Sequence, residues 1–340
     1  MSSRIGRLRR FRLAPGVWFA MPWFVGLFGL TLLPMIASIL LSFVAWDGVS
    51  FDGIRWVGLE HYRQMFAVEP GEPVPTDPFP SLWARLGCRP HDPRFIKALY
   101  NSVIYSAFAV PLGLLASLLL AMLLNQKLRG ITFLRTLYYL PHVLGGVATI
   151  MIWRWIFHPD FGLLNAFLLD VYRLIDPLVS ALGLGSSRDW PVPQWLYSPT
   201  MAKPSLIIMG LWGAGGAMLI FLAALQNVPE QLYEAARMDG AGRWKQFRYV
   251  TLPQISPAIF FNLVMGIIGS LQTFNQAYLM QSASQQDSLL FYVLYLYQSA
   301  FQDYRMGYAS ALAWVLFVVI MALTALTLGS ARWWVYYEAD

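Results

Sequence analysis

The sequence predicts an all-α, polytopic membrane protein with six transmembrane helices. Of its 340 residues, 57% are hydrophobic and 12% are charged, about half the charged fraction of a soluble domain. The mean hydropathy is +0.51. Long stretches without Asp, Glu, Lys or Arg recur along the chain, and about 20 apolar residues in a helix cross a bilayer. The stretches that reach or nearly reach this length are Leu13–Trp46, Ala98–Gln126, Thr136–Trp153, Pro204–Pro229, Thr251–Gln286 and Met306–Ala331.

Residues 288–302 are also uncharged, but this stretch is too short to cross a bilayer. It contains Tyr292, Tyr295 and Tyr297, and tyrosine favours the level of the lipid headgroups. We therefore expect an interfacial or re-entrant helix here, and not a seventh span.

The distribution of charged residues predicts the orientation of the spans. If the N-terminus is cytoplasmic, the inner segments hold more basic than acidic residues, whereas the longer outer loops hold more acidic than basic ones. This asymmetry follows the positive-inside rule. It predicts a multi-pass membrane protein with both termini in the cytoplasm. The net charge of +6 is then explained by topology, and nucleic acid is not an expected partner.

The spans divide the chain into successive segments. We expect a basic cytoplasmic tail at 1–12, a first span at 13–46, an extracytoplasmic loop at 47–94, a core with five spans at 95–331 and a cytoplasmic tail at 332–340. The prolines and acidic residues of the loop predict irregular, solvated backbone. A second outer loop, 158–203, is expected to contain a short amphipathic helix near Leu163–Ile175.

The residues offer little for catalysis. Cys88 is the only cysteine, which excludes an intrachain disulfide. Neither metal-ligand spacing nor a nucleophile–base pair is present, and the phosphate-binding pattern G-x-x-x-x-G-K-[ST] is missing. We expect no catalytic residue, no metal and no cofactor in this chain. A membrane-embedded transferase would need a polar catalytic cluster, and only dispersed acids such as Asp160 and Asp170 are available.

The middle of each predicted span lacks charged residues. Such a charge costs roughly a few kcal/mol and usually marks ion or proton coupling. Its absence argues against a proton-driven transporter and fits a carrier of neutral or weakly charged cargo whose energy comes from outside the membrane. In the fifth span, residues at steps of three or four are expected to share one face. They are Asn262, Gly266, Ser270 and Thr273.

A polar, basic segment at 230–253 separates the fourth and fifth predicted spans. Pro229 and Glu230 predict a helix start, because proline and an acidic residue both suit the first turn. Gly240 and Gly242 predict a sharp turn, since glycine tolerates positive φ. The segment is therefore expected to begin as a short helix followed by a turn.

The second half of this segment predicts another short helix. Trp244, Phe247 and Val250 lie three residues apart, as on one packing face, and Leu252-Pro253 is expected to end the helix. The resulting helix-turn-helix on the cytoplasmic membrane face has a shape that fits a groove on a soluble partner. An ordinary basic loop is the alternative.

The same segment carries the pattern E-A-A-x3-G-x9-[IV]-x-L-P, from Glu234 to Pro253. This resembles the EAA loop of the membrane subunits of binding-protein-dependent ATP-binding cassette (ABC) importers. Val250 stands where that family usually has Ile, a mild departure. The resemblance covers roughly 95–330, beginning with the run Phe95–Ser102 at the entry to the first core helix. The polar stretch 281–287 departs from the Gly-Gly-Pro that family members often carry.

The resemblance implies a type I ABC importer permease core with a cytoplasmic coupling helix, located in a prokaryotic plasma (inner) membrane. In such permeases the EAA loop docks on the ATPase, and we call residues 230–253 the coupling segment. The residues expected to couple this chain to an ATPase are Glu234, Ala235, Ala236, Asp239, Gly240, Trp244, Phe247, Leu252 and Pro253.

The resemblance also implies a substrate site on the fourth and fifth spans. The residues expected on the substrate path are Trp212, Gly216, Ser270, Thr273 and Phe274. The Asp239-Gly240-Ala241 and LPQISPAI runs resemble the carbohydrate-importing branch, so the expected cargo is a small-molecule sugar. Glycerol-phosphate or another polyol is an alternative cargo, and a stand-alone secondary transporter is an alternative of another class.

The expected partners also follow from the resemblance. They are a second, homologous permease, an ATPase dimer that binds ATP and Mg, an extracytoplasmic substrate-binding protein and the lipid bilayer. ATP hydrolysis is expected in the ATPase, so this chain is expected to be a transporter subunit and not an enzyme.

Overall fold

The structure, a computed structural model, describes residues 15–50, 52–72, 78–126, 129–144, 146–183 and 186–336. The predicted tail at 1–12 lies outside these residues, as does the C-terminal tail beyond residue 336. Helices dominate the described part of the chain, in which the strands form two short antiparallel pairs. This confirms the all-α prediction.

Three described helices are long and apolar enough to cross a bilayer by themselves: Phe19–Leu41, Pro93–Leu124 and Met306–Trp334. Three further pairs of helices meet the same test only together, because each pair is bent. The bend is 96° between Ile131–Val143 and Gly146–Ile156, 47° between Ala202–Trp212 and Gly215–Gln226, and 64° between Arg243–Gln254 and Ser256–Leu271. Counting each pair as one span gives up to six in the described residues, in agreement with the sequence.

One compact unit consists of the described residues up to Tyr62 together with Ser299–Trp314. Its apolar helix runs without interruption through α1 (Pro15–Val25), the π-helix η1 (Gly26–Leu32) and α2 (Leu33–Leu41). The predicted first span, 13–46, is too long at its C-terminal end. The Ser42 hydroxyl donates to the Ile39 carbonyl at 2.7 Å, and the chain then leaves the helix.

The predicted loop at 47–94 is more ordered than its composition suggests. β1 (Val44–Ala45) pairs with β2 (Arg55–Trp56), and β3 (Val68–Pro70) pairs with β4 (Cys88–Pro90). Two short helices, α3 (Glu60–Phe66) and α4 (Pro80–Leu86), lie between these strands in sequence. The expectation of irregular backbone throughout was therefore wrong, because strand pairing satisfies backbone groups that composition assigned to water.

The second unit contains the described residues of 63–298 and 315–336. Apart from the loop already described and the segment 230–254, its helices are α5 (Pro93–Leu124), α6 (Ile131–Val143), α7 (Gly146–Ile156), α8 (Leu163–Ala181), α9 (Ala202–Trp212), α10 (Gly215–Gln226), α14 (Ser256–Leu271) and α15 (Asn275–Met280), with the 3₁₀ turns η2 (Ser187–Asp189) and η4 (Ala283–Gln285). α16 (Tyr292–Phe301) and α17 (Met306–Trp334) contribute residues to both units.

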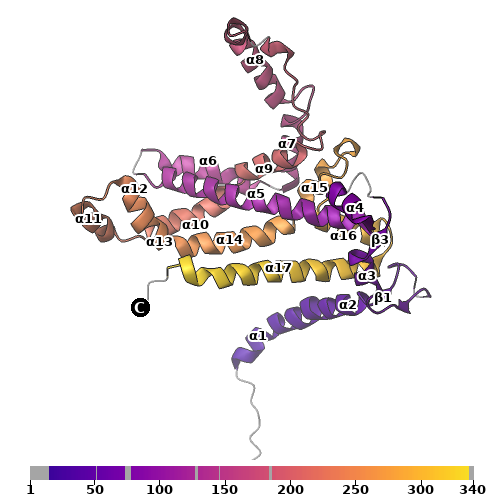
Figure 1. The fold of residues 1–340 in the computed structure, drawn as a ribbon. Coiled ribbons are helices and arrows are strands. Elements are labelled where there is room, and N and C mark those ends of the chain that lie inside the picture. Colours follow the sequence, from indigo (N-terminus) through magenta and orange to yellow (C-terminus); the bar gives the residue numbers. More distant parts are fainter. Residues whose placement is uncertain are drawn as a thin grey trace, which may run out of the picture. The chain divides into compact units, whose positions relative to one another are not determined.

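α5 is the helix on which α9, α10 and α14 pack, and Figure 1 shows it as one long, unbroken helix. It begins at Pro93, two residues before the predicted core boundary, because the Asp92 side chain accepts the Phe95 N–H at 2.9 Å and caps the helix. At the other end of α5, a cluster of fully or nearly fully buried side chains joins α5, α10 and the residue before α14. Its members are Ala121, Leu124, Met218, Phe221, Leu222, Leu225 and Ile255.

The predicted fifth span, Thr251–Gln286, is not one helix. α14 ends at Leu271, and α15 and η4 follow as separate short elements. The predicted span was too long because its end was set by the next charged residue. The Gln, Asn, Thr and Ser residues of 272–286 are uncharged but still suit turns.

The short helix predicted within 288–302 is present as α16. Two of its tyrosines, however, do not lie at the lipid headgroups, as the prediction assumed. Tyr292 and Tyr295 are buried inside the protein. The Tyr292 ring packs edge-on to Phe95 with 6.0 Å between centroids, and the Tyr295 hydroxyl donates to Asp92 at 2.5 Å. These tyrosines therefore hold α16 against α5 and do not face lipid headgroups. The amphipathic helix expected near Leu163–Ile175 is confirmed as the longer α8.

Gly215 lets α10 and α6 approach closely. A Cβ atom at Gly215 would lie 2.3 Å from the Tyr138 carbonyl oxygen, which is backbone and cannot rotate away. Small residues permit such approaches where helices meet inside a bilayer. Gly329 in α17 is the opposite case, because a Cβ atom at Gly329 would have no atom of the described residues within 4 Å beyond its own helix backbone.

These two glycines predict opposite effects of one substitution. Gly215→Ala should destabilise the protein by about 1–3 kcal/mol through overpacking, whereas Gly329→Ala should stabilise it by about 0.5–1 kcal/mol through helix propensity. Thermal unfolding of the detergent-solubilised variants measures both. Equal shifts of the same sign would contradict the close approach of α6 and α10.

Candidate functional site

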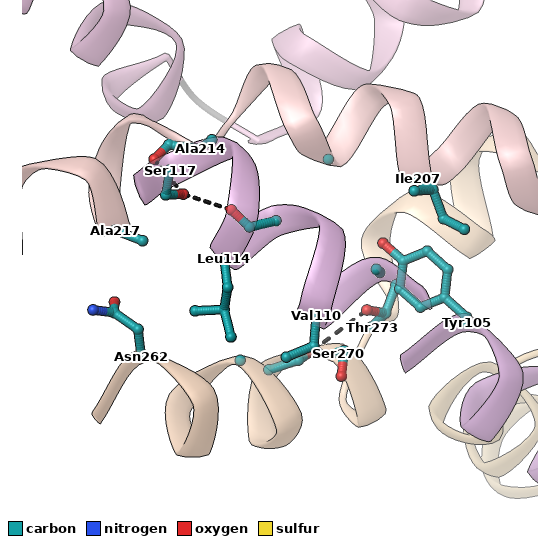
Figure 2. A pocket seen from close by; sticks show the side chains of 15 residues that line it. Tyr105, Val110, Leu114, Ser117, Ile207, Ala214, Ala217, Asn262, Ser270 and Thr273 are labelled. Atoms are coloured by element: carbon teal, nitrogen blue, oxygen red, sulfur yellow. Dashed lines mark hydrogen bonds between the residues drawn. The ribbon is translucent and has the colours of Figure 1, made fainter. Parts of the chain in front are cut away.

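A cavity of about 340 Å³ lies among α5, α9, α10 and α14. Its size is in the range of small-molecule sites. Figure 2 shows side chains from these helices around it. The lining residues are Tyr105, Ala109, Val110, Gly113, Leu114, Ser117, Ile207, Gly210, Ala214, Ala217, Asn262, Gly266, Gly269, Ser270 and Thr273. Among these described residues none is charged.

α14 and the residues after it supply one polar edge of the cavity. Asn262, Gly266, Ser270 and Thr273 all line it, so the common face expected from their spacing is present. Gly266 brings α14 close to α5, because a Cβ atom there would lie 3.1 Å from Val110 Cγ1. Asn262 and Thr273 are nearly buried, and their side chains place amide and hydroxyl groups along this edge.

α5 supplies the facing edge. Tyr105, Ala109, Gly113 and Ser117 follow one another at steps of four and all line the cavity. The Ser117 hydroxyl lies 2.8 Å from the Gly113 carbonyl and 3.0 Å from that of Ala214, at the break between α9 and α10. The Ala214 carbonyl also accepts the Met218 N–H at 3.0 Å, so the Ser117 hydroxyl adds a second bond to it and ties α5 to the start of α10.

A second contact joins α5 to α14 beside the cavity. The Ser106 and Ser270 hydroxyl oxygens lie 2.7 Å apart, and Ser270 donates to the Ile267 carbonyl at 3.0 Å. Ser106 is then the donor to Ser270. Hydroxyl pairs of this kind hold helices together in lipid.

The predicted substrate-path residues separate into two groups. Ser270 and Thr273 line the cavity. Trp212, Gly216 and Phe274 lie outside the lining that the described residues form. Their role on a path therefore stays a prediction, and each has a packing contact of its own.

The packing contacts of these three residues are aromatic. The Trp212 and Trp153 rings meet edge-on with 5.8 Å between centroids. A Cβ atom at Gly216 would lie 2.6 Å from the His142 ring, so the glycine leaves room for that ring. Phe274 stacks on Tyr278 with 5.4 Å between centroids.

Sequence reasoning missed the α5 side of the cavity. The signal was present, because small and hydroxyl-bearing residues recur every four positions from Tyr105 to Ser117. The same four-residue step identified the α14 edge. Without the fold, however, nothing in the sequence says that α5 faces α14.

The coupling segment begins with α11 (Glu230–Met238). Gly240 has φ +73°, as the predicted turn requires. The Gly240 N–H donates to the Arg237 carbonyl at 3.0 Å and the Ala241 N–H to the Ala236 carbonyl at 2.9 Å. This is the Schellman arrangement at a helix C-terminus, which favours glycine at the left-handed position. The spacing from Ala236 to Gly240 in the motif is thus explained by one helix ending.

The second arm of the coupling segment runs through α12 (Arg243–Gln246), the π-helix η3 (Phe247–Thr251) and α13 (Leu252–Gln254). The prediction that Leu252-Pro253 ends this helix was wrong. Pro253 lies in the first turn of α13, where its missing N–H is tolerated. The bend comes instead at Ile255, before α14.

Two side-chain hydrogen bonds hold the coupling segment together. The Tyr233 hydroxyl on α11 lies 2.9 Å from Thr251 Oγ1 in η3, and Gln246 Nε2 donates to the Ala241 carbonyl at 2.7 Å. Thr251 and Ile255 are 7% and 0% exposed, and Ile255 belongs to the buried cluster of α5 and α10. The segment is therefore anchored at the start of α14.

The outer surface of the coupling segment presents large apolar side chains. Met238, Trp244 and Tyr249 are 89%, 72% and 74% exposed in the single chain. Trp244 packs on Phe247 with 5.6 Å between ring centroids. Exposed apolar side chains gathered on one short segment mark an interaction site more often than chance. Among the predicted coupling residues, Ala236, Phe247, Leu252 and Pro253 are half-buried, and the others are exposed.

Comparison with known proteins places the chain in a family. Residues 94–334 match the family described as "Binding-protein-dependent transport system inner membrane component". The probable ABC transporter permease protein YesP of Bacillus subtilis is 36% identical over 335 residues, covering 98% of this chain and 94% of that protein. The lactose transport system permease protein LacF of Rhizobium radiobacter is 32% identical, covering 71% of this chain and 78% of that protein.

A solved structure shows the same fold. The bacterial alginate ABC transporter, crystallised with an alginate pentasaccharide-bound periplasmic protein, contains a chain that matches with a TM-score of 0.70. The match covers 93% of this chain and 94% of that one at 21% identity. With the family match over most of its length, this chain belongs to the inner membrane components of binding-protein-dependent transport systems and is an ABC transporter permease.

Proposed function

We propose that this permease pairs with a second, similar permease to form the path for a carbohydrate. An extracytoplasmic binding protein delivers the cargo, and a partner ATPase dimer supplies the energy. The observation that carries this proposal is the coupling segment: a hydrogen-bonded helical hairpin that exposes Met238, Trp244 and Tyr249 and is anchored at the start of cavity helix α14. A surface of apolar knobs between charges fits a groove on a soluble partner.

The cavity supports a polyhydroxylated cargo. Tyr105, Ser117, Asn262, Ser270 and Thr273 bring phenol, hydroxyl and amide groups to an otherwise apolar lining, and such groups pair with sugar hydroxyls. Relatives named for lactose and for sulfoquinovosyl glycerol transport agree with this class. Glycerol-phosphate and other polyols share the hydroxyl chemistry and stay alternatives.

The proposed mechanism is alternating access. Closure of the ATPase dimer on ATP moves α11, and the Tyr233–Thr251 contact passes that movement to η3. Because Ile255 is fixed in the buried cluster, α14 and its edge of the cavity move with the coupling segment. The spans then open outward and the binding protein releases its cargo into the cavity. With the coupling segment on the cytoplasmic side, where the ATPase binds, both termini are cytoplasmic.

Co-purification from solubilised membranes tests this proposal. The wild-type chain should bring down a second permease and an ATPase whose activity the loaded binding protein stimulates. Gly240→Pro should abolish both, because proline requires φ near −65° and Gly240 has φ +73°. Gly240→Asn is the matched control, since asparagine tolerates the left-handed region. A chain that purifies alone and moves sugar without ATP would overturn the proposal in favour of a stand-alone transporter.

The Tyr233–Thr251 contact predicts a coupling defect without loss of assembly. Tyr233→Phe and Thr251→Val each remove one hydrogen bond, worth about 1 kcal/mol, so the sugar moved per ATP should fall about fivefold while the ATPase still co-purifies. Thr251→Ser keeps the hydroxyl and should behave as wild type. Uptake and phosphate release in the same proteoliposomes give the ratio, and an unchanged ratio in both removal variants would refute this role.

The cavity predicts an effect on cargo alone. Asn262→Leu replaces an amide of the lining with an apolar side chain that also branches at Cγ, and loss of the amide should weaken apparent cargo affinity about tenfold, as for one to two lost hydrogen bonds. Basal ATPase activity and assembly should not change. Transport assays over a range of concentrations measure this, and an unaltered affinity would place the cargo elsewhere.

A further inference from the structure

Two positively charged lysines, Lys97 and Lys203, lie near the starts of the cavity helices α5 and α9. Lys97 is in the second turn of α5 and Lys203 is in the first turn of α9. Both are half-buried. The two helices pack on one another, and Lys203 contacts the ring of Tyr100, which follows Lys97 by three residues on α5. Because residues three apart are neighbours on a helix surface, both lysines lie beside the same face of α5.

Neither lysine has a carboxylate partner in the part of the chain that the structure describes. There the ion pairs join Glu69 to Arg89 and His91, and Asp170 to Arg173. Lys203 Nζ lies instead over the Tyr100 ring, 5.5 Å from its centroid. A ring face offsets part of the cost of desolvating a cation, but it cannot neutralise two like charges. The pair therefore leaves uncompensated positive charge in this part of the described chain, where an anion would be attracted.

The position of Lys203 ties the pair to the cavity. Lys203, Ile207 and Gly210 are spaced four and three residues apart on α9, which sets them along one helix face, and Ile207 and Gly210 line the cavity. Each lysine lies within the first two turns of its own helix, where the helix dipole adds positive potential. An anion held here would lie about one helical turn beyond the uncharged lining.

We propose that Lys97 and Lys203 form an oxyanion site at the mouth of the cavity, and that the cargo is a carbohydrate bearing a carboxylate or a similar anionic group. This inference rests on the proposed import of carbohydrate and narrows its substrate class. The uncharged cavity takes the sugar hydroxyls, and the lysine pair takes the charge. The spans keep no charge at mid-membrane, so the anion is met at the entrance and then passes a neutral lining.

A binding comparison on the purified importer complex tests this site directly. The probes are an uncharged disaccharide methyl ester and the uronic acid disaccharide from which it derives, titrated calorimetrically against the complex in phosphatidylcholine nanodiscs without binding protein. Wild type should bind the uronate about tenfold more tightly than the ester. Lys203→Gln should abolish this preference, Lys97→Gln should reduce it, and Lys203→Arg should retain it. Arg173→Gln, a surface change outside the site, should leave it intact.

Several outcomes would overturn the site. Equal binding of the two probes by wild type, absence of binding of either probe, or a preference that survives in the Lys97→Gln/Lys203→Gln double variant each contradicts it. A lipid headgroup offers the same chemistry. If phosphatidylglycerol in the nanodiscs raises thermal stability only when both lysines are present, while the probes bind alike, the site is a lipid site and the cargo inference fails. Co-purification of the ATPase is unaffected by any of these results, so failure here is distinguishable from failure of the importer proposal.

Discussion

The burial of Ile255 is the constraint on which the account depends. This residue lies at the bend between the coupling segment and α14, and it is packed among α5 and α10 side chains with no exposed surface. Because interiors are close-packed, a force applied to the coupling segment cannot bend the chain freely at this point. The hydrogen bond between Tyr233 and Thr251, four residues before Ile255, joins α11 to the same rigid body. The exposed apolar surface of the coupling segment and the α14 edge of the cavity are therefore parts of one rigid body.

The cavity exists because small residues set the spacing of the helices around it. Gly266 allows α14 to approach Val110 of α5, and Gly215 allows α10 to approach the α6 backbone. In lipid, where burial of apolar surface no longer drives helix association, such contacts and the hydroxyl bonds of Ser106 and Ser117 hold the helices together. The same hydroxyl-bearing stripe supplies the polar lining. Packing and binding therefore draw on the same residues, which explains why mutation at these positions is best tested with separate assays of assembly and affinity.

Sequence reasoning succeeded where one local interaction fixes one residue type. Gly240 is determined by the Schellman ending of α11, and Asn262, Gly266, Ser270 and Thr273 by the pitch of a helix, so both features could be predicted. It failed where the outcome depends on distant parts of the chain. Tyr292 and Tyr295 are buried against α5, and residues 272–286 leave the helix although they are uncharged. The α5 edge of the cavity was missed for the same reason. Its four-residue pattern is visible in the local sequence, but the helix that it faces, α14, is far away in the sequence.

The most direct test of the account is a distance measurement within the chain. Spin labels at Gln231 on α11 and Met265 on α14, both exposed, with Cys88 changed to Ser, report on the joint between them in the complex with its ATPase. The account predicts that the label-to-label distance is the same with and without ATP, while the distance from Met265 to a label on the second permease changes. A change between Gln231 and Met265 of several ångströms would show that the bend at Ile255 flexes, and the coupling segment and α14 would then not move as one body.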